Sequence, residues 1–212
     1  MLRRVVFVSR EVIKSLKSLE RARKRARELR RLIGNRQENL LENILKHFEE
    51  HDINVEAVPA DTIDGHEARL RDDGNLFYDE RLDNKPERKL FVLAHELGHF
   101  DLKHKFTNYT DSHQLGVGTD YANNGAGAVA RYHARIYEEA EADAFATEFL
   151  TPCREIFNAW INSGALTSMQ IAENFSVEPE VVRTQLAQGM YEYLYGGEQE
   201  REQRKKLEVR LT

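Results

Sequence analysis

The sequence has a single cysteine, Cys153, in 212 residues, which excludes an internal disulfide framework and is typical of a reducing compartment. Proline and glycine are scarce, at 4 and 12 residues, which favours long helices over a turn-rich sandwich or barrel. No apolar run approaches the ~20 residues that a membrane-spanning helix needs. The apolar stretch at residues 5–8 is too short for the core of a signal peptide. We therefore expect a soluble, cytoplasmic protein.

The net charge of −5 is unevenly distributed along the chain. Residues 1–36 hold 13 Lys and Arg against 3 Glu, a local charge of +10, so the remaining residues carry −15. This asymmetry predicts a basic N-terminal arm with a partner or a face of its own. The arm could bind nucleic acid, an acidic partner or an anionic membrane. The alternative is a solvated helix whose apolar stripe packs on the rest of the protein or on another copy.

The hydrophobic periodicity predicts a mostly helical α+β protein with a small antiparallel sheet. Apolar residues recur at three- and four-residue steps in the expected helices, which lie at about 11–33, 37–50, 86–103 and 131–150. The expected strands lie at 53–58, 67–70 and 75–78, the last two forming a hairpin around Asp72-Asp73-Gly74. Residues 105–130 are rich in Gly, Asn, Asp and Thr and are expected to form a long loop.

We expect four parts along the chain. These are a basic helical arm (1–36), a core (37–152), a C-terminal helical module of short helices (153–195) and a charged tail (196–212). Residues 167–188 have the spacing of a helix-turn-helix motif, but the helix that would read DNA carries Glu178 and Glu180 and only Arg183. A surface with more acids than bases repels phosphates, so we interpret this segment as a packing module.

The motif His95-Glu96-Leu97-Gly98-His99 carries the strongest chemical signal. On a helix, positions i and i+4 lie above one another on one face, so the two imidazoles could hold one metal ion. Glu96 lies beside the first histidine, where it could serve as general base in metal-assisted hydrolysis. Zinc is the expected ion, and a third protein ligand must come from elsewhere. The alternative is a core helix whose histidines only form hydrogen bonds.

A second motif, at residues 138–146, offers candidates for the third ligand. Glu138 and Glu139 both flank the apolar face of the predicted helix, whereas Glu141 points well away from it, so periodicity leaves two candidates. Asp143 lies one turn after Glu139 and could accept the outer N–H of a ligand histidine, as carboxylates near zinc sites do. The alternative is a charged helix end with solvated glutamates.

These two motifs, followed by Phe149-Leu150-Thr151-Pro152, resemble the ImmA/IrrE metallopeptidases over about residues 37–190. The resemblance implies a zincin-like (gluzincin) core at 37–152, zinc ligands His95, His99 and Glu139, and Glu96 as catalytic base. One Zn²⁺ per chain is implied, with Mn²⁺ as another candidate ion. The implied activity is endopeptidase cleavage of a helix-turn-helix transcriptional repressor, which would derepress genes of stress response, DNA repair or mobile elements.

One predicted strand, one histidine and the single cysteine are weaker candidates for a functional role. The strand Asn75-Leu76-Phe77-Tyr78 could lie at a sheet edge and hold substrate by backbone pairing, or be an ordinary strand. His104 lies five residues after His99, on the wrong face for the same metal, and is expected to be a surface histidine. Cys153 is expected to be a packed thiol rather than a zinc switch.

Two other functions are compatible with the same residues. One is a catalytically silent regulator that binds repressor or nucleic acid through the basic arm. The other is a zinc hydrolase whose substrate is not a protein.

Overall fold

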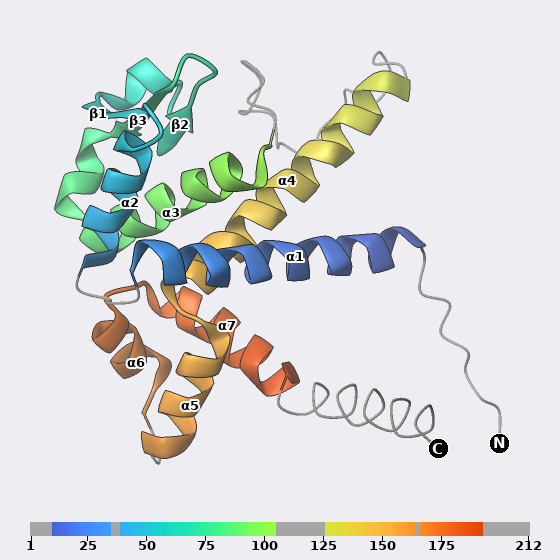
Figure 1. The fold of residues 1–212 in the computed structure, drawn as a ribbon, viewed down its shortest axis with the longest axis vertical. Helices are drawn as coiled ribbons and strands as arrows, with labels where there is room; N and C mark the ends of the chain where they lie inside the picture. Colours follow the sequence, from blue (N-terminus) through green and yellow to red (C-terminus); the bar gives the residue numbers. More distant parts are fainter. Residues whose placement is uncertain (1–9, 35–38, 105–125, 164–165, 193–212) are drawn as a thin grey trace. The chain divides into compact units, whose positions relative to one another are not determined.

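The computed structural model describes residues 10–34, 39–104, 126–163 and 166–192. It contains two compact units, Met1–Phe149 and Leu150–Thr212, which are described separately below. The expected tail at 196–212 and most of the expected loop at 105–130 lie outside the described residues. The elements are mostly helices, together with one small sheet, which confirms the α+β class (Figure 1).

Four long helices shape the first unit. They are α1 (Arg10–Ile33), α2 (Leu40–Glu49), α3 (Pro86–Leu102) and α4 (Ala126–Leu150). All four were expected, but α4 begins well before residue 131. Its first turn lies in the segment Ala126-Gly-Ala-Val-Ala, where three alanines, the best helix formers, outweigh the single glycine. In the part of the chain that the structure describes, no helix is both long enough and apolar enough to cross a membrane.

A three-stranded sheet completes the first unit. It consists of β1 (Asn54–Val58), β2 (Ala68–Leu70) and β3 (Asn75–Asp79) in the order β1-β3-β2, with 3-10 helices η2 (Ala60–Ile63) and η3 (Glu80–Asn84). β2 and β3 form the expected hairpin. The expectation of a purely antiparallel sheet is wrong, because β1 pairs with β3 in parallel. The chain returns through η2 and β2 before it enters β3, so β1 and β3 run in the same direction.

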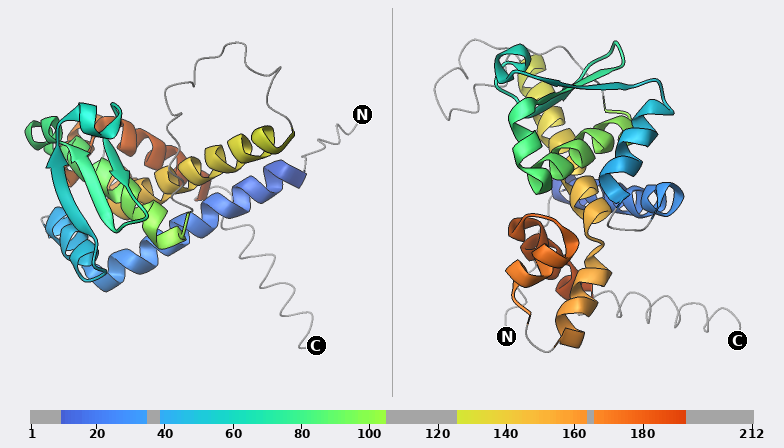
Figure 2. Two further views of the ribbon diagram at one scale, coloured as in Figure 1. Left: turned by 90° about the horizontal axis from the view of Figure 1, so that it is seen from above. Right: turned by 90° about the vertical axis from the view of Figure 1, so that its left-hand side faces the viewer.

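Ion pairs join the basic helix α1 to the C-terminal part of α4 within this unit, and both helices can be followed in Figure 2, α1 in blue and α4 in yellow. Its apolar stripe is buried at Ala22, Ala26 and Leu29. Arg27 Nη1 donates to Glu148 Oε1 of α4 at 3.0 Å, and the Arg25 guanidinium forms a two-point ion pair with the buried Asp101 carboxylate, at 2.6 and 2.8 Å. Part of the positive charge of the arm is therefore neutralised inside the protein.

A glycine sets the distance between α3 and α4. A Cβ added at Gly98 would lie 3.1 Å from Phe145 Cδ1 and 3.2 Å from both Cα and O of Ala142. Such distances are shorter than ordinary van der Waals contact. Gly98 thus lets the backbone of α3 approach the backbone of α4 at the turn between His95 and His99, which brings the two chemical motifs together.

The second unit contains α5 (Cys153–Ser163), α6 (Ser168–Phe175) and α7 (Pro179–Tyr191). Thr167 begins α6 with a capping box shared with Gln170, and Ser176 ends it in the left-handed conformation, with φ 51°. Several apolar residues give residues 167–188 the spacing of a helix-turn-helix motif. Four of them have buried side chains: Ile171, Ala172, Val181 and Val182. Cys153 is fully buried, as expected for a packed thiol.

Candidate metal centre

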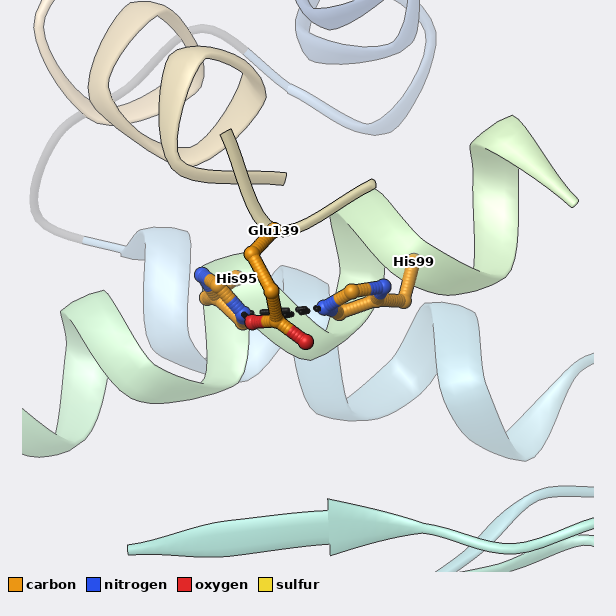
Figure 3. A group of neighbouring side chains, drawn as sticks. All are labelled: His95, His99 and Glu139. Atoms are coloured by element: carbon orange, nitrogen blue, oxygen red, sulfur yellow. Dashed lines mark hydrogen bonds and ion pairs between the residues drawn. The ribbon is translucent and has the colours of Figure 1, made fainter. Parts of the chain in front are cut away.

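Three side chains from α3 and α4 converge on one point (Figure 3). His95 and His99 are one turn apart on α3, with 2.9 Å between their Nε2 atoms. Glu139 reaches them from α4, its Oε2 lying 3.3 Å from His95 Nε2 and 3.6 Å from His99 Nε2. Of the two glutamates that periodicity left open, Glu139 is the one whose carboxylate contacts both histidines.

The arrangement of these atoms fits a small tetrahedral cation. Zinc bound at 2.0–2.1 Å with tetrahedral angles separates its ligand atoms by about 3.4 Å. The three separations observed, 2.9, 3.3 and 3.6 Å, bracket that value. Two imidazole nitrogens and one carboxylate oxygen are also a donor set that zinc prefers. The three atoms therefore converge as a metal site requires.

Charge and hydrogen bonding hold His95 in place. Its Nδ1 lies 2.8 Å from Asp143 Oδ1, so Nδ1–H donates to the carboxylate, and its Nε2 faces Glu139 and His99. Burial opposes the charged imidazole, but the hydrogen bonds to Asp143 and Glu139 prevail and raise the pKa of His95 to about 10 in the metal-free protein. Burial likewise disfavours the charged Glu139, yet the two histidines hold the pKa of its carboxyl well below the usual range.

His104 is not the surface histidine that its sequence position suggests. It is buried, with 8% of its surface exposed, and its Nδ1 lies 2.9 Å from His99 Nδ1. Its Nε2 lies 2.8 Å from Oε2 of Glu141, which is itself only 7% exposed. Burial lowers the pKa of His104, although Glu141 works in the opposite direction. Periodicity placed Glu141 well away from the apolar face of its helix, but its carboxylate is buried and faces this second histidine.

Glu96 is held by the sheet. Its Oε2 accepts a hydrogen bond from the backbone N–H of Leu70 in β2, at 3.2 Å. β2 is an edge strand that pairs with β3 on one side, through the backbone N–H of Arg71 among others. Because alternate residues of a strand direct their N–H groups to opposite sides, the N–H of Leu70 points outward from the sheet edge. Among the described residues, the carboxylate next to the histidine pair therefore lies at the outer edge of β2.

Of the two alternatives for Asn75-Leu76-Phe77-Tyr78, the edge strand is wrong and the ordinary strand is correct. β3 is the central strand, with β1 on one side and β2 on the other, so its backbone groups are already paired. Sequence reasoning also missed the contact of Leu70 with Glu96 and the pairing of His104 with Glu141. Only the closeness of His104 to the metal-ligand motif was visible in the sequence.

A protein-family model matches the part of the chain that contains these residues. The Peptidase_M78 model, described as the IrrE N-terminal-like domain, matches residues 48–187, which is about two thirds of the chain. The matched segment contains α3, the whole sheet, and the four residues His95, Glu96, His99 and Glu139. A search of curated proteins gives no match.

Proposed function

Because the chain belongs to the Peptidase_M78 family, with its IrrE N-terminal-like domain, we propose that it is a zinc-dependent endopeptidase. One observation carries the proposal: side-chain atoms of His95, His99 and Glu139 converge, at separations of 2.9, 3.3 and 3.6 Å. Glu96 directly follows the first of these residues on the same helix. A peptidase family and a three-residue ligand cluster next to a carboxylate together favour metal-assisted hydrolysis of a peptide bond.

The catalytic roles follow from these positions. His95, His99 and Glu139 would hold the metal, and bound zinc supplies Lewis acidity towards the scissile carbonyl and lowers the pKa of water. Glu96 would accept a proton from the attacking water and donate it to the leaving amine. Its hydrogen bond from the N–H of Leu70 keeps the carboxylate oriented before substrate arrives. Asp143 would hold the His95 ring in the orientation that presents Nε2 to the metal.

The substrate would lie along β2 rather than along β3. An extended peptide can add to a sheet by pairing with a free strand edge, and main-chain hydrogen bonds then hold it without regard to most of its side chains. In the part of the chain that the structure describes, the outer edge of β2 is such an edge, except at Leu70, whose N–H donates to Glu96. A peptide paired there would pass beside the general base, which suits an endopeptidase.

The biological substrate we propose is a helix-turn-helix transcriptional repressor in the cytoplasm, whose cleavage would derepress stress, DNA-repair or mobile-element genes. This part of the proposal rests on the resemblance to the ImmA/IrrE metallopeptidases. The rival role as a nucleic-acid-binding regulator depends on the charge of the basic arm, and Arg25 and Arg27 of that arm are paired with Asp101 and Glu148.

Cleavage of a peptide library tests the activity without knowledge of the substrate. Zinc-loaded wild-type protein and the E96Q variant are incubated with peptides and with folded proteins from a cell extract, and new N-termini are identified by mass spectrometry. We expect new termini with the wild type that E96Q does not produce. Glu87→Gln, an exposed glutamate in the first turn of the same helix, is the matched control and should cleave normally. Absence of any Glu96-dependent cleavage would overturn the proposed activity.

A further inference from the structure

A buried histidine–glutamate pair lies beside the candidate metal centre and has no role in the proposed reaction. His104 and Glu141 are both more than nine-tenths buried, and they are hydrogen-bonded to each other at 2.8 Å. The other nitrogen of His104 contacts His99, one of the three candidate ligands, at 2.9 Å. Burying an imidazole and a carboxylate away from water is costly unless both are well paired. The pair is thus built into the first unit and connects directly to the metal centre.

The end of α3 explains how His104 reaches this position. The helix ends at Leu102, and Lys103 adopts the left-handed conformation, with φ 58°. The N–H of His104 then donates to the carbonyl of His99 at 3.0 Å, and the N–H of Lys103 donates to Phe100 at 3.1 Å. These two bonds form a Schellman motif, which reverses the chain over the last turn. The reversal carries the His104 ring back to the ring of His99.

The hydrogen-bonding chemistry of Glu141, His104 and His99 determines which ring nitrogens carry protons. The Glu141 carboxylate only accepts hydrogen bonds, so the Nε2 of His104 carries a proton and donates it. A neutral His104 then has a bare Nδ1, which accepts from the Nδ1–H of His99. His99 is left with its lone pair on Nε2, the atom that lies among the other ligand atoms.

The two ligand histidines are therefore supported in different ways. His95 donates directly to the exposed carboxylate of Asp143. His99 donates to a second histidine, which in turn donates to a buried carboxylate. The exposed Arg21 of α1 also lies near Glu141, with its Nη2 3.5 Å from Glu141 Oε2. Both outer members of this longer relay are buried.

We propose that His104 and Glu141 are positioning residues for zinc, which hold His99 in the tautomer and ring orientation that direct its Nε2 at the metal. The inference rests on the proposed zinc site. Partners of this kind typically change metal affinity by about 10- to 100-fold when they are removed. In the H104F variant, the Nδ1–H of His99 has no acceptor. In E141Q, the new amide can donate as well as accept, so it no longer fixes the direction of the relay.

Zinc affinity, measured by competition with a chromogenic chelator, tests this inference without reference to catalysis. We expect affinity to fall by about 10- to 100-fold in H104F and about tenfold in E141Q. Glu148→Gln is the matched control, because Glu148 is also a buried glutamate of α4 paired with an arginine of α1. Arg21→Gln removes the ion pair with Glu141 and leaves the relay intact. Both controls should bind zinc within about twofold of the wild type.

A second readout follows the protons themselves and does not depend on whether a variant is destabilised. Nitrogen-15 NMR of histidine-labelled, zinc-loaded wild type should show His99 protonated at Nδ1 and His104 at Nε2. In E141Q, the other tautomer of His104 should become populated. Unchanged zinc affinity in both variants, an equal loss in E148Q, or His104 protonated at Nδ1 in the wild type would each overturn the inference. A wild-type protein that binds no zinc would instead overturn the proposed function as well.

Discussion

Because α3 and α4 approach closely at Gly98, we expect a side chain at this position to lower both the stability of the protein and its zinc affinity. In the G98A variant, the added Cβ meets Phe145 at 3.1 Å and the backbone of Ala142 at 3.2 Å. The phenylalanine ring can turn aside, but the backbone of Ala142 moves only with α4. The two helices must therefore separate by a few tenths of an ångström. Glu139 lies one turn before Ala142 on α4, so it moves away from the histidines of α3.

The magnitude follows from two opposing terms. Overpacking of this kind costs about 1–3 kcal/mol. Alanine in place of glycine in a helix interior recovers about 1 kcal/mol. We expect a net loss of about 1 kcal/mol in the free energy of unfolding, or ~2–4 °C in the thermal midpoint for a chain of this size. Metal–ligand distances tolerate changes of only about 0.2 Å, so zinc affinity should fall about tenfold.

Thermal unfolding of the metal-free protein and chelator competition measure the two effects. Gly189→Ala is the matched control, because its Cβ would lie 2.7 Å from Phe157 Cβ and 2.9 Å from the Cys153 carbonyl, both in the second unit. It should lower stability and leave zinc affinity unchanged. A G98A protein that binds zinc as tightly as the wild type and unfolds at the same temperature would refute the argument that Gly98 sets the helix separation.

Three further predictions concern separate parts of the molecule. Asp143→Asn should lower zinc affinity about tenfold in chelator competition, because the amide can also donate and no longer fixes the Nδ1–H of His95; an unchanged affinity would contradict this role. Since the pKa of metal-free His95 is raised to about 10, zinc must displace a proton below that pH. Zinc affinity should therefore rise about tenfold per pH unit between about pH 6 and pH 9, and a flat profile would exclude the displacement. Thr167→Ala removes the cap of α6 and should cost about 1 kcal/mol in thermal unfolding, with no change in zinc affinity; a stability equal to that of the wild type would show that the cap contributes nothing.

Periodicity and motif spacing predicted the helices well, because each depends on residues close together in the sequence. The i, i+4 spacing of His95 and His99 requires only that the segment be helical, as α3 is. Periodicity alone could not separate Glu138 from Glu139, since both flank the same face. The close packing at Gly98 fixes how α4 lies on α3, and that contact is not visible in either motif alone.

The wrong predictions, for His104 and for the place of β3 in the sheet, also depend on contacts between residues far apart in the sequence. The prediction for His104 assumed that the helix continues through residue 103. Lys103 instead adopts a left-handed conformation, which glycine favours and which a lysine in the sequence does not predict. The central place of β3 depends on strand order, which alternation of polar and apolar residues does not encode. Both errors concern how the chain turns between elements rather than which elements form.

The zinc content of the purified protein, beside its E139A and E138A variants, tests the central claim most directly. The two glutamates are neighbours in the sequence, but Glu139 is the one that lies within 3.6 Å of both ligand histidines. We predict about one zinc per chain in the wild type and in E138A, and loss or strong weakening of binding in E139A. No zinc after reconstitution, or binding indifferent to Glu139, would contradict the three-ligand site and the peptidase chemistry built on it.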